Sequence, residues 1–153
     1  MKEVIICETL EEAVRGSDII SESVSVKPGQ YPTYKKEWLK PGVTLIATSF
    51  FNMDKKELVG IRKVVDNWKM YEEYGIEDEE GYDENGMRKA TGCMGEEFYY
   101  MVEDGLITRD SIDHLGEIIR GKKPGRKSDD EIIFVAIEGC LLYTSPSPRD
   151  RTR

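Results

Sequence analysis

The stretch Val4–Ile20, VIICETLEEAVRGSDII, decides the class of fold. It begins with the apolar triplet Val4–Ile6, ends on a pair of isoleucines, and has an amphipathic segment between the two. Thr9 and Glu12 have the spacing of a capping box, in which a hydroxyl and a carboxylate satisfy free N–H groups at a helix start, and Gly16 stands where such a helix commonly ends. The stretch therefore predicts a strand, a helix and a second strand.

Three more apolar runs predict further strands, at Val43–Thr48, Lys63–Asp66 and Glu131–Ile137. In the first and last of them the apolar residues are nearly continuous, which is typical of strands with both faces covered. A short turn with some helical character is predicted at Tyr34–Leu39, between proline and glycine residues. Strands separated by crossovers of this length predict an α/β fold with a mainly parallel, doubly wound sheet.

Helical periodicity appears in the second half of the chain, at Glu96–Val102 and more clearly at Ser111–Arg120. In the second of these helices, four apolar residues share one face before Gly121: Ile112, Leu115, Ile118 and Ile119. Residues 76–92 read as an acidic insertion at the surface. This insertion lacks the alternating ligands of a calcium-binding loop.

Composition narrows the class of protein. The 153 residues are 39% hydrophobic and 34% charged, which is enough for one domain with a core but hardly for two. All apolar runs are far shorter than the roughly 20 residues that cross a bilayer, so no membrane partner is expected. The 30 acidic and 22 basic residues give a formal charge of −8, which argues against nucleic-acid binding.

The cysteines and the two ends of the chain point to a reducing compartment and an unusual tail. Cys7, Cys93 and Cys140 form no CxxC or Cys/His cluster, so neither a disulfide framework nor a metal site is indicated. Without a visible N-terminal signal, a cytoplasmic location is the simplest interpretation. Residues 140–153, CLLYTSPSPRDRTR, change to serine, proline and arginine without periodicity. We interpret them as a translation artefact, with a disordered natural tail as the alternative.

Ligands of doubly wound sheets bind beyond the carboxyl ends of the strands. Three segments fall there: Ser21–Val26, Thr48–Lys55 and Glu138–Gly139. Their small hydroxylic residues would let a cofactor approach the backbone, although ordinary polarity at strand ends explains them equally well. The sequence contains neither GxGxxG nor a Walker motif, which usually cradle phosphate at a helix N-terminus. A sheet that lacks its first βαβ unit is the simplest explanation.

Several other reactive residues are interpreted as structural. His114 is assigned to the solvated face of the predicted helix, away from any strand end, and Cys93 to a structural thiol. A basic cluster is expected to be solvated or paired within the chain (Arg120, Lys122, Lys123, Arg126 and Lys127). A set of aromatic residues is expected to pack in the core (Tyr71, Tyr74, Phe98, Tyr99 and Tyr100).

Four stretches, in the right order, resemble the ornithine cyclodeaminase and mu-crystallin family. They are Thr9–Ile20 (TLEEAVRGSDII), Trp38–Ala47 (WLKPGVTLIA), Glu57–Leu58 and Asp113–Ile133 (DHLGEIIRGKKPGRKSDDEII). The last of these is the most specific. Within the family, the acidic insertion and the Ser49–Asp54 stretch resemble most closely the branch associated with tyramine oxidase.

The resemblance implies a homodimer in which a substrate and dimerisation domain precedes a Rossmann domain that holds NAD or NADP. Such proteins act on small amino acids by hydride transfer at the α-carbon, followed by deamination and cyclisation, or they reduce imines. It also implies that residues 1–139 are the C-terminal part of the Rossmann domain. A fragment without the phosphate loop is expected to be inactive, to bind dinucleotide weakly, and to be poorly stable because a sheet edge is exposed.

The resemblance assigns cofactor contacts to six positions: Ser23, Val24, Ser25, Thr48, Ser49 and Lys55. The catalytic aspartate of the ornithine enzymes aligns with Phe51, which cannot transfer a proton, unless Asn52 or Asp54 replaces it. A serine near the cofactor aligns with Ile137. No catalytic residue is therefore assigned. A non-catalytic NAD(P)-binding accessory protein and an autonomous α/β binding module remain as alternatives.

Overall fold

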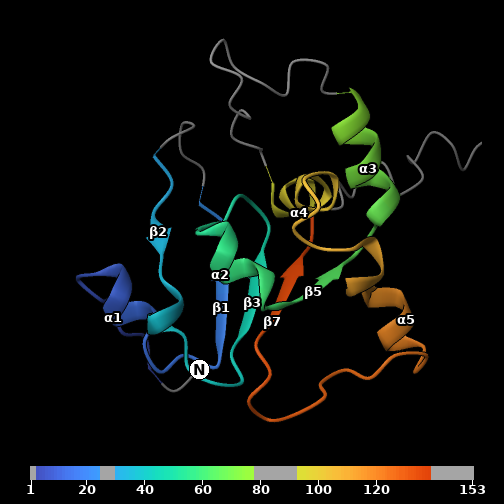
Figure 1. The fold of residues 1–153 in the computed structure, drawn as a ribbon. Helices are drawn as coiled ribbons and strands as arrows, with labels where there is room; N and C mark the ends of the chain where they lie inside the picture. The colour runs from blue at the N-terminus through green and yellow to red at the C-terminus, as the bar shows by residue number, and fades with distance from the viewer. Residues whose placement is uncertain (1–2, 25–29, 78–92, 139–153) are drawn as a thin grey trace, which may run out of the picture.

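The protein is built on a parallel sheet. The computed structural model describes residues 3–24, 30–77 and 93–138 (Figure 1). Within them a five-stranded sheet has the order β1-β3-β7-β5-β6, and each neighbouring pair is parallel. The strands are β1 (Ile19–Glu22), β3 (Thr44–Ala47), β7 (Ile133–Ala136), β5 (Arg62–Val65) and β6 (Ile112–His114). A smaller parallel sheet pairs β2 (Thr33–Tyr34) with β4 (Asn52–Met53).

Helices alternate with these strands along the chain. They are α1 (Leu10–Val14), α2 (Lys55–Val59), α3 (Trp68–Glu77), α4 (Met94–Glu103) and α5 (Leu115–Ile119), with 3₁₀ turns η1 (Lys36–Trp38) and η2 (Arg109–Ser111). In the described ranges, no helix has the length and apolar character needed to cross a membrane. Helices alternating with parallel strands define an α/β fold of Rossmann-like architecture, as the sequence predicts.

The order of the strands follows their apolar pattern. β7 has a strand on each side, and its Phe134 and Ala136 have no exposed surface. β1 pairs with β3 alone within the described sheet, and there Ile20 is buried while Ile19 is 63% exposed. A continuous apolar run thus marks the central strand, and an alternating one marks the edge.

An aromatic cluster holds the carboxyl half of the sheet to its neighbours. Phe134 of β7 meets Phe51 and Phe98 edge-on, at centroid distances of 5.1 and 5.4 Å. Tyr34 of β2 stacks on Phe51 at 3.8 Å. The cluster joins the central strand to the loop after β3, to α4 and to the small sheet. Most of the predicted aromatic core is confirmed, since Tyr71, Phe98 and Tyr100 are buried, although Tyr74 is 40% exposed.

The start of α1 is capped as the sequence predicts. Thr9 Oγ1 accepts a hydrogen bond from the Glu12 amide at 3.1 Å. The Glu12 carboxylate accepts from the Glu8 amide at 3.0 Å, one residue earlier than in the usual capping box. Gly16 ends the segment with a φ of +80°, a conformation that glycine adopts without strain.

The predicted strand at Val4–Ile6 is wrong. These residues form no strand and are 74%, 72% and 91% exposed. An apolar run becomes a strand only where another strand supplies backbone partners, and no described strand lies beside this one.

The predicted helix at Ser111–Arg120 is also wrong in its first half. Ile112–His114 form β6, which pairs with β5, and only Leu115–Ile119 are helical. Ile119, assigned to the buried face, is 76% exposed. Sheet pairing and an ion pair at Asp113 outweigh the helical periodicity here.

Other predicted elements agree with the structure to within a few residues. The turn at Tyr34–Leu39 contains the 3₁₀ turn η1, and the helix at Glu96–Val102 is α4. The predicted acidic insertion begins inside α3, which ends at Glu77, and the rest of it lies outside the described residues. The tail at 140–153 lies outside them too.

Candidate functional site

Two of the predicted cofactor segments leave the sheet side by side. The amide and hydroxyl of Thr48 both donate to the Glu22 carbonyl, at 3.0 and 3.1 Å. The Val24 amide donates to the Glu22 carboxylate at 2.9 Å, while Ser23 is exposed. Ser25 lies outside the described residues. The structure therefore brings Ser23, Val24 and Thr48 together, but the donors of Val24 and Thr48 are already used within the chain.

Glu22, which the sequence analysis did not single out, is a buried carboxylate at the end of β1. It is 3% exposed and accepts a hydrogen bond from the Tyr34 hydroxyl. Burial, reinforced by Glu22, raises the pKa of Tyr34 above its usual value. An acidic residue ending an apolar strand was the available signal. Its contacts show that it fastens β2 to the edge of the sheet.

Ser49 differs from the other predicted contacts because its hydroxyl is buried yet unused. It lies two residues beyond Ala47, the last paired residue of β3. Among the described residues its Oγ has no hydrogen-bond partner. A buried hydroxyl without a partner costs about 1–3 kcal/mol, which makes Ser49 the predicted residue best placed to bind a ligand.

Lys55 is held by another helix. Its Nζ lies 2.8 Å from Glu97 Oε1, and the Glu97 side chain is only 7% exposed. The pair links the start of α2 to α4. The structure therefore gives the ammonium group of Lys55 a structural ion pair.

The loop after β3 offers no acid for proton transfer. Phe51 has no exposed surface. Asn52 Nδ2 donates to Thr33 Oγ1 at 2.9 Å, and the Asp54 carboxylate caps α2 by accepting from the Lys56 amide at 2.8 Å. The two side chains that could have replaced the aspartate thus hold local structure.

A second group of polar residues lies where β5 and β7 end. We call Asp66, Tyr71, Cys93 and Glu138 the carboxyl-edge cluster. The Tyr71 hydroxyl donates to Asp66 Oδ1 at 2.7 Å and accepts from the Glu138 amide at 3.1 Å. The Glu138 carboxylate is hydrogen-bonded by the Cys93 thiol and by the backbone of Met94. Its Oε1 atom is buried and, within the described part of the chain, has no partner.

The protonation states within the carboxyl-edge cluster follow from burial. Burial raises the pKa of Glu138 to about 7, and nearby Glu96 and Asp66 reinforce this against the hydrogen bonds from Cys93 and Met94. Burial and then Glu138 raise the pKa of the Cys93 thiol, which confirms a structural rather than a nucleophilic cysteine. Glu138 is therefore the group of the cluster that exchanges its proton near neutral pH.

A cavity of about 330 Å³ opens at the same edge, beyond β5 and β6. It is lined by Asp66, His114, Gly116, Glu117, Arg120 and Lys122. The prediction that His114 lies away from any strand end is wrong, because His114 is the last residue of β6. Its Nε2 lies 2.8 Å from Arg109 Nη2, and it acts as acceptor since a guanidinium only donates.

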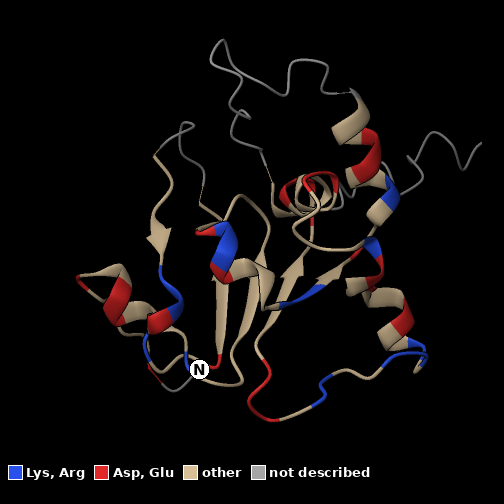
Figure 2. Ribbon diagram, in the orientation of Figure 1, with Lys and Arg blue, Asp and Glu red and all other residues tan. Residues whose placement is uncertain are grey.

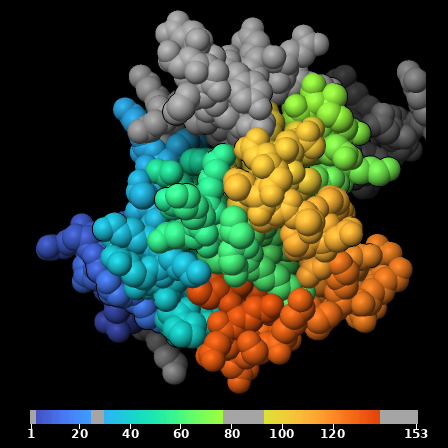
Figure 3. Space-filling model, viewed as in Figure 1, coloured from blue at the N-terminus to red at the C-terminus, as the bar shows by residue number. Residues whose placement is uncertain are grey.

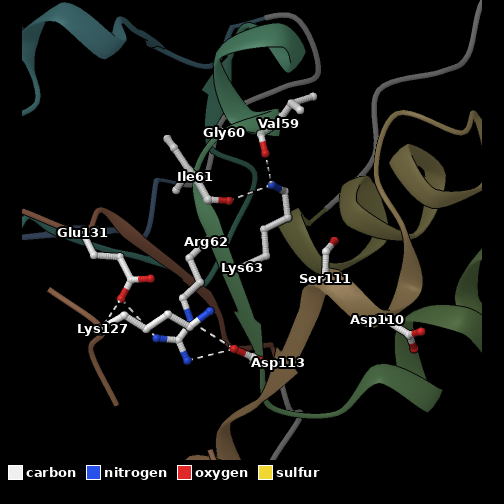
Figure 4. Close-up of a pocket in the computed structure, with 10 residues that line it drawn as sticks. All are labelled: Val59, Gly60, Ile61, Arg62, Lys63, Asp110, Ser111, Asp113, Lys127 and Glu131. Atoms are coloured by element: carbon white, nitrogen blue, oxygen red, sulfur yellow. Dashed lines mark hydrogen bonds and ion pairs between the residues drawn. The ribbon is translucent and has the colours of Figure 1, made fainter. Parts of the chain in front are cut away.

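A second cavity, of about 340 Å³, lies at the opposite edge, where β5 and β6 begin (Figure 4). Arg62 reaches Asp113 at 2.8 Å and Glu131 at 3.2 Å, and the Lys127 amide donates to Glu131 at 2.8 Å. These charged groups neutralise one another within the chain, so this cavity is a structural ion-pair network.

The predicted basic cluster belongs partly to this network. Lys123 lies 2.7 Å from Asp113, and Arg126 donates to Thr44 Oγ1 at 2.9 Å and to the Glu131 carbonyl. Basic and acidic residues lie close together along this loop (Figure 2). In the space-filling view the orange part of the chain, which contains this loop, packs along one end of the molecule (Figure 3). Pairing within the chain, as predicted, is confirmed for Lys123 and Arg126.

The fold and the site define the class of protein as a Rossmann-like α/β protein with its polar, partly unpaired groups at the carboxyl edge of a parallel sheet. Among the described residues, no three His, Cys, Asp or Glu side chains gather in a way that could hold a metal ion. The chain belongs to the ornithine cyclodeaminase/mu-crystallin family, whose sequence profile matches residues 1–140.

Individual relatives agree with this assignment. A Rhizobium meliloti (strain 1021) protein named as a dehydrogenase is 28% identical over 127 residues, which are 83% of this chain and 33% of the relative. An archaeal alanine dehydrogenase dimer with bound NAD is 25% identical, with a TM-score of 0.58 over 86% of this chain and 35% of that one.

A third similar protein shares the fold at lower identity. The Δ1-pyrroline-2-carboxylate reductase of Thermococcus litoralis, solved with NADH and L-proline, is 20% identical, with a TM-score of 0.56 over 87% of this chain and 36% of that one. This chain therefore spans about a third of the length of its relatives.

Proposed function

We propose that this chain is part of an NAD(P)-dependent enzyme that acts on a small amino acid or on the corresponding imine. The observation that carries the proposal is the buried, unpartnered Ser49 hydroxyl at the carboxyl edge of a parallel sheet, where such folds bind ligands. Membership of the family and the NAD bound to the archaeal alanine dehydrogenase support it.

The residues at this edge fit one part of a dinucleotide. Ser49 and the exposed Ser23 supply hydroxyls suited to a ribose or a carboxamide. The pyrophosphate is not provided for, because the sequence contains no GxGxxG loop. When bound, the nicotinamide accepts the hydrogen and two electrons of the substrate Cα–H bond.

As part of the same proposal, residues 1–139 are the C-terminal part of a Rossmann domain and residues 140–153 are a translation artefact. The complete protein would be a cytoplasmic homodimer, like the dimeric archaeal alanine dehydrogenase in its number of protomers. Long-read sequencing across the locus tests this division. A reading frame that extends upstream through a GxGxxG loop supports it, whereas a gene that runs only from Met1 to Arg153 contradicts it.

One observation favours a second function, that of a non-catalytic NAD(P)-binding accessory protein. Phe51, which stands where the family resemblance places a catalytic aspartate, is fully buried against Tyr34 and Phe134. Such a protein would bind dinucleotide without turning over any amino acid. The two functions therefore differ in turnover and agree in binding.

The first test is dinucleotide binding by the complete protein, followed by titration of NADH and NADPH fluorescence. Ser49→Ala should weaken binding about five-fold, equivalent to one hydrogen bond of about 1 kcal/mol. The unliganded variant should be as stable as the parent or more so, because an unpaired hydroxyl is removed. Ser128→Ala, on an exposed loop, is the matched control and should change neither quantity. Absence of any dinucleotide binding by the parent protein would refute the proposal.

A further inference from the structure

We propose that Glu138 is the acid–base residue of this site and exchanges a proton with the nitrogen of the amino-acid substrate. The inference rests on the proposed function and deepens it by naming a group that the comparisons assign to no role. It would also explain how an enzyme of this family works without an acid at position 51.

The position of Glu138 suits this role. It follows Ala136, the last residue of β7, by two positions, and β7 is the central strand of the described sheet. On one side lies β3, followed by Ser49, and on the other lies β5, followed by Asp66. Glu138 is therefore placed between the proposed dinucleotide residues and the cavity of about 330 Å³ beyond β5 and β6.

The carboxylate is held firmly but not completely. The amide of Glu138 donates to the Tyr71 hydroxyl at 3.1 Å, and Tyr71 in turn donates to Asp66, which lines that cavity. The Cys93 thiol and the Met94 backbone bind the carboxylate from the start of α4. One oxygen, Oε1, remains buried and without a partner among the described residues, as does Ser49 Oγ across the neighbouring strand end.

These two atoms are the two buried side-chain oxygens or nitrogens that lack partners in the described part of the chain. Both follow adjacent parallel strands at the same edge. Leaving two such groups unpaired is costly, and active sites are where such costs are retained, because a ligand supplies the missing partner.

The surroundings of Glu138 set its proton affinity near neutrality. It faces Asp66 and Tyr71 from β5 and α3, and Cys93 and Glu96 from α4. The acidic neighbours and burial disfavour its charged form, whereas the thiol and the Met94 amide favour it. Groups that exchange protons near the working pH are the most effective acid–base catalysts.

The step itself is a proton transfer. In the direction of amino-acid oxidation, the Glu138 carboxylate takes one proton from the substrate ammonium, so that an O–H bond forms and an N–H bond breaks. The electron pair stays on nitrogen and becomes available for the C=N bond, while the nicotinamide of the proposed function is the oxidant. In the direction of imine reduction, the protonated Glu138 returns the proton to the product amine.

Three variants of the complete protein test the assignment. Glu138→Gln keeps the shape and the acceptor for Met94 but cannot exchange a proton at this pH. Glu138→Asp keeps the acid one methylene further away. Glu72→Gln, on the exposed face of α3, is the matched control. Circular dichroism and NADH binding establish that each variant is folded and holds dinucleotide.

Two readouts follow. Carbon-13 NMR of the glutamate carboxyls should show one resonance titrating near pH 7, absent from Glu138→Gln. With NAD(P)⁺ and a panel of small amino acids, kcat/KM of the parent should fall below pH 7. Glu138→Gln should lose about 10²–10⁴-fold in kcat together with that limb, and Glu138→Asp should recover part of it.

The outcomes separate the two proposals. If the parent protein binds dinucleotide and turns over an amino acid, but Glu138→Gln retains its rate and pH profile, Glu138 is not the acid–base residue and the proposed function stands. A resonance titrating near pH 4.5 would likewise overturn the assignment. If the parent protein binds no dinucleotide, the proposed function is wrong and the role of Glu138 fails with it.

Discussion

Arg62 is expected to be the charged residue on which the stability of the described fold depends most. Its side chain is 7% exposed and contacts Asp113 and Glu131, at 2.8 and 3.2 Å. It also donates to the carbonyls of Pro124 and Gly125, at 2.7 and 2.9 Å. One guanidinium therefore holds the loop between α5 and β7 against the amino ends of β5 and β6.

Arg62→Met keeps the length of the side chain and removes all these bonds. Removing one partner of a buried ion pair costs about 3–5 kcal/mol. Asp113 keeps Lys123 at 2.7 Å and Glu131 keeps the Lys127 amide at 2.8 Å, so we expect the lower end of that range. A loss of about 3 kcal/mol is a large part of the roughly 5–15 kcal/mol that stabilises a typical domain.

Urea unfolding followed by circular dichroism measures the loss. The matched control is Arg15→Met, because Arg15 pairs with Glu11 in the same helix while both side chains are about half exposed. This pair should contribute about 0.5 kcal/mol or less. Equal losses for Arg62→Met and Arg15→Met would refute the reasoning, since burial is the difference on which it depends.

The same variant should change the response to acid. Burial acts to raise the pKa of Asp113, but hydrogen bonds from Lys123 and Arg62 outweigh it and hold the pKa below its usual value. A carboxyl whose pKa is lower in the folded state contributes stability above its unfolded pKa, about 3.9, and this is lost as the pH falls through the folded value. The part of the acid-induced loss due to Asp113 should therefore be smaller in Arg62→Met.

Two further predictions concern buried groups. Burial lowers the pKa of Lys63 to about 8, so the unfolded chain binds more protons between pH 8 and about 10.4; the free energy of unfolding should rise over that window, and Lys63→Met should abolish the rise in urea titrations at several pH values. An unchanged slope would contradict this. A Cβ on Gly95 would lie 2.2 Å from the Tyr71 ring, so Gly95→Ala should cost about 1–3 kcal/mol by thermal or urea unfolding. Gly116→Ala is the control, with 3.5 Å to the flexible Arg120 side chain, and should be neutral or stabilising by up to about 1 kcal/mol; similar losses for both variants would show that Tyr71 does not limit the space.

Local pattern and periodicity were sufficient for much of the fold. The strands at Ile19–Glu22, Thr44–Ala47 and Ile133–Ala136 coincide with apolar runs that the sequence marks plainly, and Thr9 caps α1 as its spacing indicates. These features depend on residues that are close along the chain, because side-chain alternation and capping act over a few residues. The family resemblance came from the same level of information and is confirmed.

Long-range pairing decided the rest. Ile112–His114 became a strand because β5 lies beside it and Arg62 binds Asp113 from 51 positions away, contacts that no local periodicity encodes. Val4–Ile6 stayed outside the sheet because an apolar run needs a partner strand, whatever its propensity.

The candidate site divides in the same way. Sequence alone determined that polar residues follow β1 and β3, and so it identified Ser23, Val24, Thr48 and Ser49. Only the tertiary structure decided which of them has an unused hydroxyl, and only it joined Glu138 to Tyr71 and Cys93 at the end of β7. The physical reason is that burial and hydrogen bonding, which set the proton affinity of a carboxyl, arise from groups brought together by the fold.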